Sequence, residues 1–154
     1  MALNLSTAFK QQILGAQSFA EIFMNSAIRV FTGVQPASAD LAETGTLLGV
    51  ITNNGDPWAA GQPSNGLQFQ LQGSSMAIAL GQAWRLNAAL SGTAGWFRIV
   101  ANGIDGGGNS LTNARIDGAI GTTATPAEMI LAQPLLTANV QYPLNAFVFA
   151  LPPF

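Results

Sequence analysis

The chain has 154 residues, no His and no Cys, and only 12 charged residues (5 Lys or Arg plus 7 Asp or Glu) against 49% hydrophobic ones. This composition excludes a disordered chain, a disulfide scaffold, a His- or Cys-ligated metal site and a catalytic triad built on His. A net charge of −2 without any basic stretch argues against a nucleic-acid partner, and no apolar run reaches the roughly 18 residues that a membrane span needs.

Residues 1–25 are expected to form a helical segment. Apolar residues share one helical face at Leu5, Phe9, Ile13 and Leu14. Ser6 or Thr7 is the expected N-cap of this helix, and Gly15 can end it. Ser18 and Glu21 have the spacing of a capping box, which predicts a second short helix.

Residues 26–154 have the pattern of a β domain. Gly, Pro, Asn, Ser and Thr interrupt the apolar residues about every eight to twelve positions, which is typical of an all-β sandwich or barrel. We therefore expect a single, mainly β domain over residues 1–154: an antiparallel β-sandwich or barrel-like domain with a short N-terminal helical segment. The expected strands are Ile28–Thr32, Thr46–Thr52, Leu67–Gln72, Ser75–Leu80, Trp84–Leu90, Gly95–Ala101, Arg115–Ile120, Ala127–Leu131 and Ala146–Leu151.

Two of these strands alternate clearly between apolar and outward-facing residues. The expected inward set is Leu67, Phe69 and Leu71 in one strand, and Phe147, Phe149 and Leu151 in the other. The breaks between strands also have turn chemistry, because Asn and Gly tolerate positive φ and Pro fixes φ near about −65°. Turns or tight loops are accordingly expected at 53–57, 62–66 and 106–108.

Residues 102–109 form a Gly-rich segment with several oxygen-bearing side chains. Calcium binds six to eight such oxygens, but this segment holds a single carboxylate, Asp105, and lacks EF-hand spacing. A hairpin tip is the better interpretation, and no metal or cofactor is expected. Nothing in the sequence pairs the few acids or Lys10 into a catalytic arrangement, so we expect no catalytic residue and no enzyme.

Arg and Trp residues are the candidates for an interaction surface, since these residue types dominate the energetics of protein interfaces. The candidate interface residues are Arg29, Trp58, Arg85, Trp96, Arg98 and Arg115. Strand alternation places Arg98 on the face of Trp96, and Asp117 on the face of Arg115. The arginines therefore either pair with the few acids and cover Trp rings, or they anchor a subunit interface.

Several segments resemble small virion structural proteins of tailed bacteriophages. The resemblance lies in Ile28–Pro36, Ala39-Asp40, Thr44–Gly49, Ser91–Arg98 and Arg115–Gly121. It spans about residues 28 to 121 and brings no catalytic residue with it. It implies a non-enzymatic particle component, either on the head or in the tail.

The scarcity of charge leads to a similar expectation by a separate route. An ordinary soluble domain is about 25% charged, whereas this chain has 8%, which favours a subunit that is largely covered in an assembly. We expect a capsid decoration or cement protein, made in the host bacterial cytoplasm and located in the virion. Its partners would be the major capsid protein or other virion proteins, and copies of itself in a homo-oligomer such as a trimer. The alternative is a tail, collar or baseplate component that binds a host-surface glycan through Trp58 and loops 53–66 and 102–113.

Overall fold

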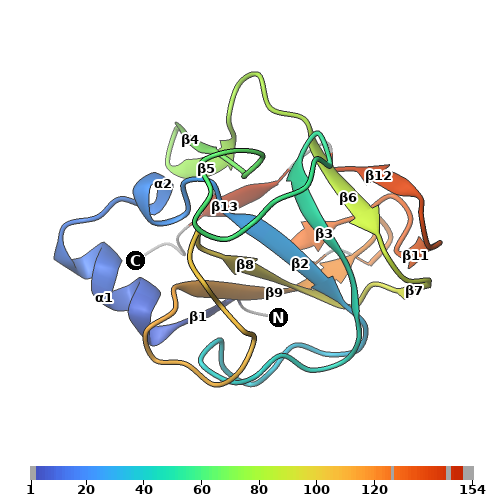
Figure 1. The fold of residues 1–154 in the computed structure, drawn as a ribbon, viewed down its shortest axis with the longest axis horizontal. Helices are drawn as coiled ribbons and strands as arrows, with labels where there is room; N and C mark the ends of the chain where they lie inside the picture. Colours follow the sequence, from blue (N-terminus) through green and yellow to red (C-terminus); the bar gives the residue numbers. More distant parts are fainter. Residues whose placement is uncertain (1–2, 126, 145–146, 151–154) are drawn as a thin grey trace.

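The computed structural model describes residues 3–125, 127–144 and 147–150. The fold is mainly β, with antiparallel sheets and a short helical segment near the N-terminus, as the sequence predicts (Figure 1). The elements are β1 (Asn4–Leu5), α1 (Thr7–Gly15), α2 (Phe19–Ile22), β2 (Ala27–Phe31), β3 (Leu47–Asn53), β4 (Phe69–Gln72), β5 (Ser75–Ile78), β6 (Trp84–Ala88), β7 (Gly92–Thr93), β8 (Trp96–Val100), β9 (Arg115–Gly121), β10 (Met129–Ile130), β11 (Leu135–Leu136), β12 (Gln141–Pro143) and β13 (Val148–Ala150).

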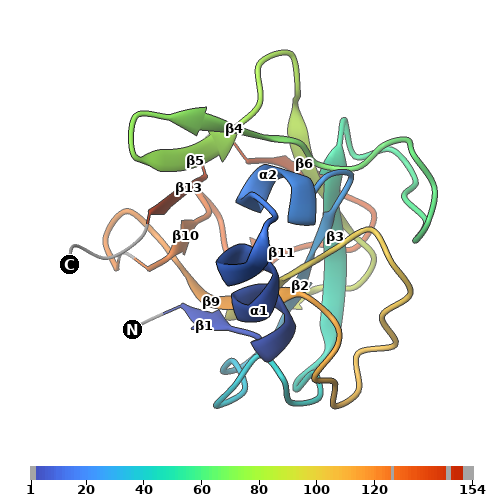
Figure 2. The same ribbon diagram turned by 90° about the vertical axis from the view of Figure 1, so that its left-hand side faces the viewer.

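The main sheet has the strand order β1-β9-β8-β2-β3-β6-β12, and β10 adds a short parallel pairing to β9. Two smaller sheets accompany it, one of three strands in the order β13-β5-β4 and one formed by β7 and β11. In Figure 2 the β4–β5 hairpin stands out from the body of the molecule, with β4 as the outermost strand. The helices lie beside this hairpin and along the β9 side of the main sheet.

One face of the main sheet forms the core, because its apolar residues are directly opposite each other across the strands. A continuous row of opposed side chains crosses β9, β8, β2, β3 and β6 through Ile116, Ile99, Ile28, Ile51 and Leu86. All five side chains are fully buried. The β-branched side chains of this row suit a pleated, buried surface, which explains why the local sequence forms strands here.

The three-stranded sheet and the helices complete the core through aromatic contacts. The ring of Phe69 in β4 lies 5.0 Å from that of Phe19 in α2 and 5.1 Å from that of Trp84 in β6. Phe149 in β13 packs against Phe19 at 4.7 Å. Such offset and edge-to-face pairs add stability beyond the area they bury, and they hold the small sheet against one end of the large one.

All nine expected strands are present, although most are a few residues shorter than the sequence suggested. For the last of them, Ala146 and Leu151 lie outside the described residues. The additional strands β1, β7, β11 and β12 are only two or three residues long. Pieces this short do not show a period-2 pattern, which explains why sequence reasoning missed them.

The helical segment is confirmed with corrections. Ser6 caps α1, and Ser18 with Glu21 forms the expected capping box of α2. Leu5 is not in the helix, because it belongs to β1 and pairs with β9. Leu14 is 85% exposed, because α1 packs on the core through the face that carries Phe9 and Ile13, four positions apart, and Leu14 lies off that face.

The turns and one of the alternating strands agree with the sequence. Positive φ angles occur at Asn54, Gly55, Asn65 and Gly107, within the expected turns. Phe147 and Phe149 are buried while Val148 is exposed. Leu71 is the exception among the expected inward residues, because β4 continues beyond the body of the protein and leaves this side chain 73% exposed.

Candidate functional site

The six candidate interface residues fall into two groups in the structure. Trp96, Arg98 and Arg115 are at most 1% exposed, so they lie beneath the surface of the chain. Arg29 and Trp58 are half-buried, and Arg85 is exposed. The structure therefore leaves only the second group within reach of a partner.

The buried arginines belong to a row of polar side chains on the outer face of the main sheet. Pairing places Asp117 of β9 opposite Arg98 of β8, and Arg98 opposite Arg29 of β2. Two like charges directly opposite each other in a sheet repel. Each arginine here has its own carboxylate, since Arg98 binds Asp117 and Arg29 binds Glu43.

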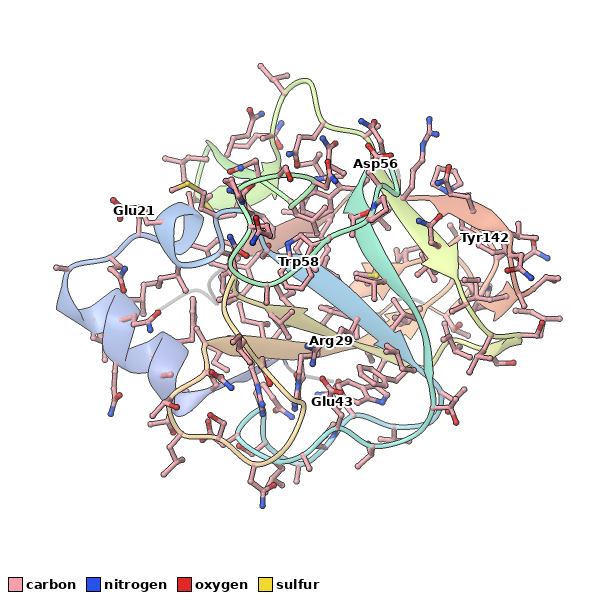
Figure 3. The ribbon with its side chains drawn as sticks, in the orientation of Figure 1. Glu21, Arg29, Glu43, Asp56, Trp58 and Tyr142 are labelled. Atoms are coloured by element: carbon pink, nitrogen blue, oxygen red, sulfur yellow. The ribbon has the colours of Figure 1, made fainter. Side chains whose placement is uncertain are left out.

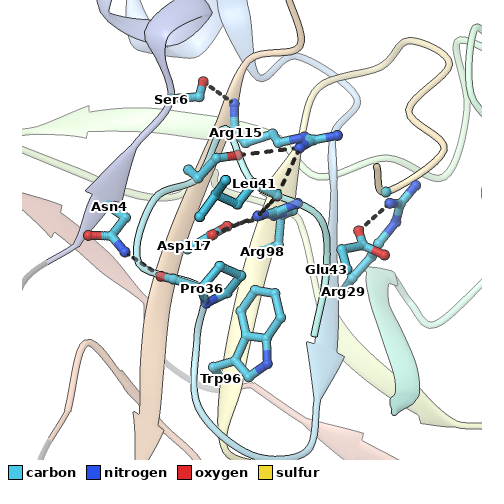
Figure 4. Close-up of polar contacts among 12 residues, drawn as sticks. Asn4, Ser6, Arg29, Pro36, Leu41, Glu43, Trp96, Arg98, Arg115 and Asp117 are labelled. Carbon is cyan, nitrogen blue, oxygen red and sulfur yellow. Dashed lines mark hydrogen bonds and ion pairs between the residues drawn. The ribbon is translucent and has the colours of Figure 1, made fainter. Parts of the chain in front are cut away.

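Two long loops, residues 32–46 and 101–114, cover this outer face and are called the covering loops here (Figure 4). Two residues of the first loop bind arginines of the sheet: the carbonyl oxygen of Leu41 accepts from Arg98 at 3.0 Å, and the carboxylate of Glu43 pairs with Arg29. Arg115 binds both carboxylate oxygens of Asp105, in the second loop. The arginines thus hold the covering loops on the sheet.

The covering loops also bind each other and the N-terminal helix. Glu43 N–H donates to the carbonyl oxygen of Gly107 at 2.8 Å, and the N–H of Ser110 donates to the carbonyl oxygen of Asp40. The carboxylate of Asp40 accepts hydrogen bonds from the backbone and the hydroxyl of Thr7 at the start of α1. Because the loops are fixed at several points, they present a defined outer surface.

Burial and ion pairing act in opposite directions on the carboxyl groups beneath the loops. Burial raises the pKa of Asp117 above its ordinary value, although the Arg98 guanidinium opposes that effect. Burial acts on Asp105 in the same direction, but the hydrogen bonds from Arg115 and Gly107 N–H outweigh it and lower its pKa. Both carboxylate oxygens of Asp105, the single carboxylate of segment 102–109, accept hydrogen bonds from the Arg115 guanidinium.

Of the two alternatives for the arginines, pairing with the few acids is the one that the structure shows for Arg29, Arg98 and Arg115. The guanidinium of Arg98 also faces the ring of Trp96 at 5.6 Å. Glu43 is the residue of this cluster that sequence reasoning did not single out, and Asp105 was considered only as a calcium ligand and not as a partner of Arg115. Their signal was the rarity of acids in the chain, since buried arginines require carboxylate partners.

A groove of about 350 Å³ lies beside the covering loops, on the outer face of β2, β3 and β6. Trp58 forms part of its wall, and its indole N–H donates to the carbonyl oxygen of Asn25 at 2.7 Å. Arg29, Asp56 and Asn87 add polar groups to a lining that is otherwise mainly apolar. Figure 3 shows Trp58 and Asp56 on the loop that crosses in front of the sheet, above Arg29 and Glu43.

Over the described residues as a whole, the surface is unusually apolar. Of the 12 charged residues, all of which are described, only Lys10, Glu21, Asp56 and Arg85 are exposed. In the same described ranges 14 large hydrophobic residues are exposed: Leu14, Met24, Val34, Leu41, Leu47, Leu71, Leu80, Leu90, Ile104, Leu111, Ile130, Leu135, Val140 and Val148. Single exposed apolar residues are normal, but an excess over exposed charges is not.

Among the described residues, no group of three or more His, Cys, Asp or Glu side chains could hold a metal ion. Within the same part of the chain, no helix has the length and apolar character needed to cross a membrane. No protein-family model, curated protein or solved structure matches this chain.

Proposed function

We propose that this protein is a non-enzymatic structural subunit of a bacteriophage particle, and that it works by packing against other proteins. The observation that carries the proposal is the ratio of 14 exposed large hydrophobic residues to four exposed charged ones. A surface of this kind favours association. The resemblance to small virion proteins between residues 28 and 121 is the reason for proposing that this assembly is a bacteriophage particle.

The internal arginine cluster supports the same proposal. Three of the five cations are ion-paired and bind the covering loops. Two of these, Arg98 and Arg115, are fully buried, so their charges are withdrawn from the outer surface. The loops expose Val34, Leu41, Ile104 and Leu111 instead. Neutral and apolar surface suits permanent interfaces, which bury more apolar area than transient ones.

Within the particle, capsid decoration is the preferred role, and the partners are the major capsid protein and copies of this chain. The test is the number of copies in purified particles, measured by mass spectrometry against the major capsid protein. Hundreds of copies per particle are expected for a decoration protein. Between three and a few dozen would instead assign the chain to the tail, collar or baseplate, and no detectable copies would refute the virion role.

A host-surface glycan is the second candidate ligand, and the position of Trp58 favours it. The ring lines the groove, and its hydrogen bond to Asn25 fixes its orientation. A fixed aromatic face with nearby amide and carboxylate groups, here Asn87 and Asp56, suits a sugar ring that has one apolar face and several hydroxyls.

Tryptophan fluorescence can test this second function, because Trp84 and Trp96 are 2% and 0% exposed and Trp58 alone lines the groove. Saturable quenching by an oligosaccharide, lost in Trp58→Ala and kept in the exposed-site control Leu14→Ala, would support glycan binding. Titrations of bacterial surface glycans without any saturable change would exclude it.

A further inference from the structure

Strand β4 is an open edge of the three-stranded sheet. Among the described strands it pairs only with β5, and it projects from the body of the molecule (Figure 2). Its sequence, Phe69–Gln72, has no charge and no proline, and its pairing with β5 has no register shift. Natural proteins protect such edges with Lys, Pro, bulges or very short strands.

Both edges of the main sheet show this protection. Strand β12 at one end of the main sheet ends in Pro143, and β1 at the other end has only two residues. By contrast, no charged residue occurs between Asp56 and Arg85, a stretch that contains the whole β4–β5 hairpin. Strand β4 therefore lacks the protection that both edges of the main sheet have.

The direction of the free backbone groups follows from the hydrogen bonds of the hairpin. Ala79 N–H donates to the carbonyl oxygen of Gln68, so residues 68, 70 and 72 direct their backbone groups toward β5. Leu67, Phe69 and Leu71 direct theirs outward. At Leu67 this outer edge is occupied, because its N–H donates to Ser26 at 2.8 Å, whereas no described residue bonds the outward groups of Leu71.

We propose that β4 pairs with β4 of a second copy of this chain, antiparallel and around a two-fold axis at Leu71. This inference rests on the proposed function and names the partner of one of its surfaces. A strand is self-complementary in this arrangement, since the N–H and C=O of each Leu71 meet those of the other. Centring the pair on residue 70 instead would bring the partner's Gly73 onto the position that Ser26 occupies opposite Leu67.

The same pairing accounts for the exposure of Leu71. Opposed residues of paired strands have Cβ atoms about 4.5–5.5 Å apart on one face, so the two Leu71 side chains would cover each other. Met76, which is opposite Leu71 in β5, lies on the same face and extends this contact. The neutral hairpin allows two identical copies to meet without like-charge repulsion, which favours a second copy over a charged partner.

Cysteine crosslinking tests this geometry, because the natural chain has no Cys. The Cα atoms of the two Leu71 residues would be about 5.5 Å apart, within the range of about 4.4–6.8 Å that a disulfide bridges. Leu71→Cys should form a linked dimer of twice the 15.9 kDa chain mass under mild oxidation. Leu80→Cys is the matched control: it is even more exposed, at 89%, but the pairing would hold its two copies more than about 20 Å apart.

Light scattering of the uncrosslinked protein gives the second measurement. Leu71→Lys places two ammonium groups opposite each other and should lower the molecular mass from dimer to monomer. Ile104→Lys, a matched change at a 91% exposed site on a covering loop, should leave the mass unchanged.

A monomeric wild-type protein, a dimer that Leu71→Lys leaves intact, or equal crosslinking of both cysteine variants would each overturn the inference. Copy number in purified particles tests the proposed function separately. A particle component that fails the crosslinking test would keep its structural role and lose only this interface.

Discussion

The buried ion pair between Arg98 and Asp117 allows the most demanding test of how the outer face is stabilised. Both side chains are 0% exposed, and they are joined by two bonds of 2.7 and 2.8 Å. Asp117→Asn preserves the shape of the side chain and removes its charge. The Arg98 guanidinium would then be left buried without its counter-ion.

Breaking a buried pair by removing one partner costs about 3–5 kcal/mol. For a chain of this size each kcal/mol lowers the melting temperature by about 2–4 °C, so we expect Asp117→Asn to lower it by about 6–20 °C. The value should fall in this range because Arg98 cannot lose its proton. Its remaining contacts are the carbonyl oxygen of Leu41 and the ring of Trp96.

Calorimetry at neutral pH is the assay, and Asp56→Asn is the control because Asp56 is exposed and should change stability by less than about 0.5 kcal/mol. Arg98→Met should be less harmful as the pH falls, since the buried Asp117 can become neutral by taking up a proton. Combining Arg98→Met with Asp117→Leu should destabilise less than Asp117→Asn. A shift below about 2 °C for Asp117→Asn would refute the reasoning.

Three further outcomes are expected from the same structure. Ser6→Ala removes the acceptor of two buried N–H groups, those of Phe9 and Arg115, and should cost about 1–3 kcal/mol in denaturant unfolding; a smaller loss would contradict the capping role. The pKa of Asp105 in the folded protein lies below its ordinary 3.8, so the ionised carboxylate stabilises the fold above that pH, and this stabilisation is lost as the pH falls through the folded pKa. The difference in free energy of unfolding between wild type and Asp105→Asn should therefore shrink as the pH falls through that range. A difference that stays constant with pH would contradict the pairing of Asp105 with Arg115. Gly95→Ala would bring Cβ onto the backbone of Gly33 in the first covering loop, and it should lower the melting temperature well below that of Gly103→Ala, where nothing lies within 4 Å. Equal melting temperatures would contradict this close approach.

Local sequence determined much of this fold. The turn residues that recur about every eight to twelve positions predicted nine strands. Alternation of apolar and polar residues then predicted the inward face of two of them, because side chains on a pleated strand point alternately to opposite faces. Ser6, Ser18 and Glu21 predicted where the helices begin, since capping depends on residues only three positions apart. The positive φ angles at Asn54 and Gly55 likewise follow from residue type alone.

Tertiary structure decided which of these residues are accessible. Alternation placed Arg98 on the face of Trp96, but it could not show that the covering loops bury that face. Leu71 has the same pattern as Leu67, and only the reach of β4 beyond the core makes one exposed and the other buried. Burial depends on chain segments distant in sequence, and no local pattern encodes it.

The candidate site shows the same division. Sequence composition determined that this chain would have few surface charges, because 12 charged residues cannot cover 154 positions. That three arginines would be used inside the chain depended on Glu43, Asp105 and Asp117 reaching them across 14, 10 and 19 positions. Carboxylate–guanidinium pairs form over a few ångströms in space, and only the folded arrangement of loops and sheet brings these residues that close.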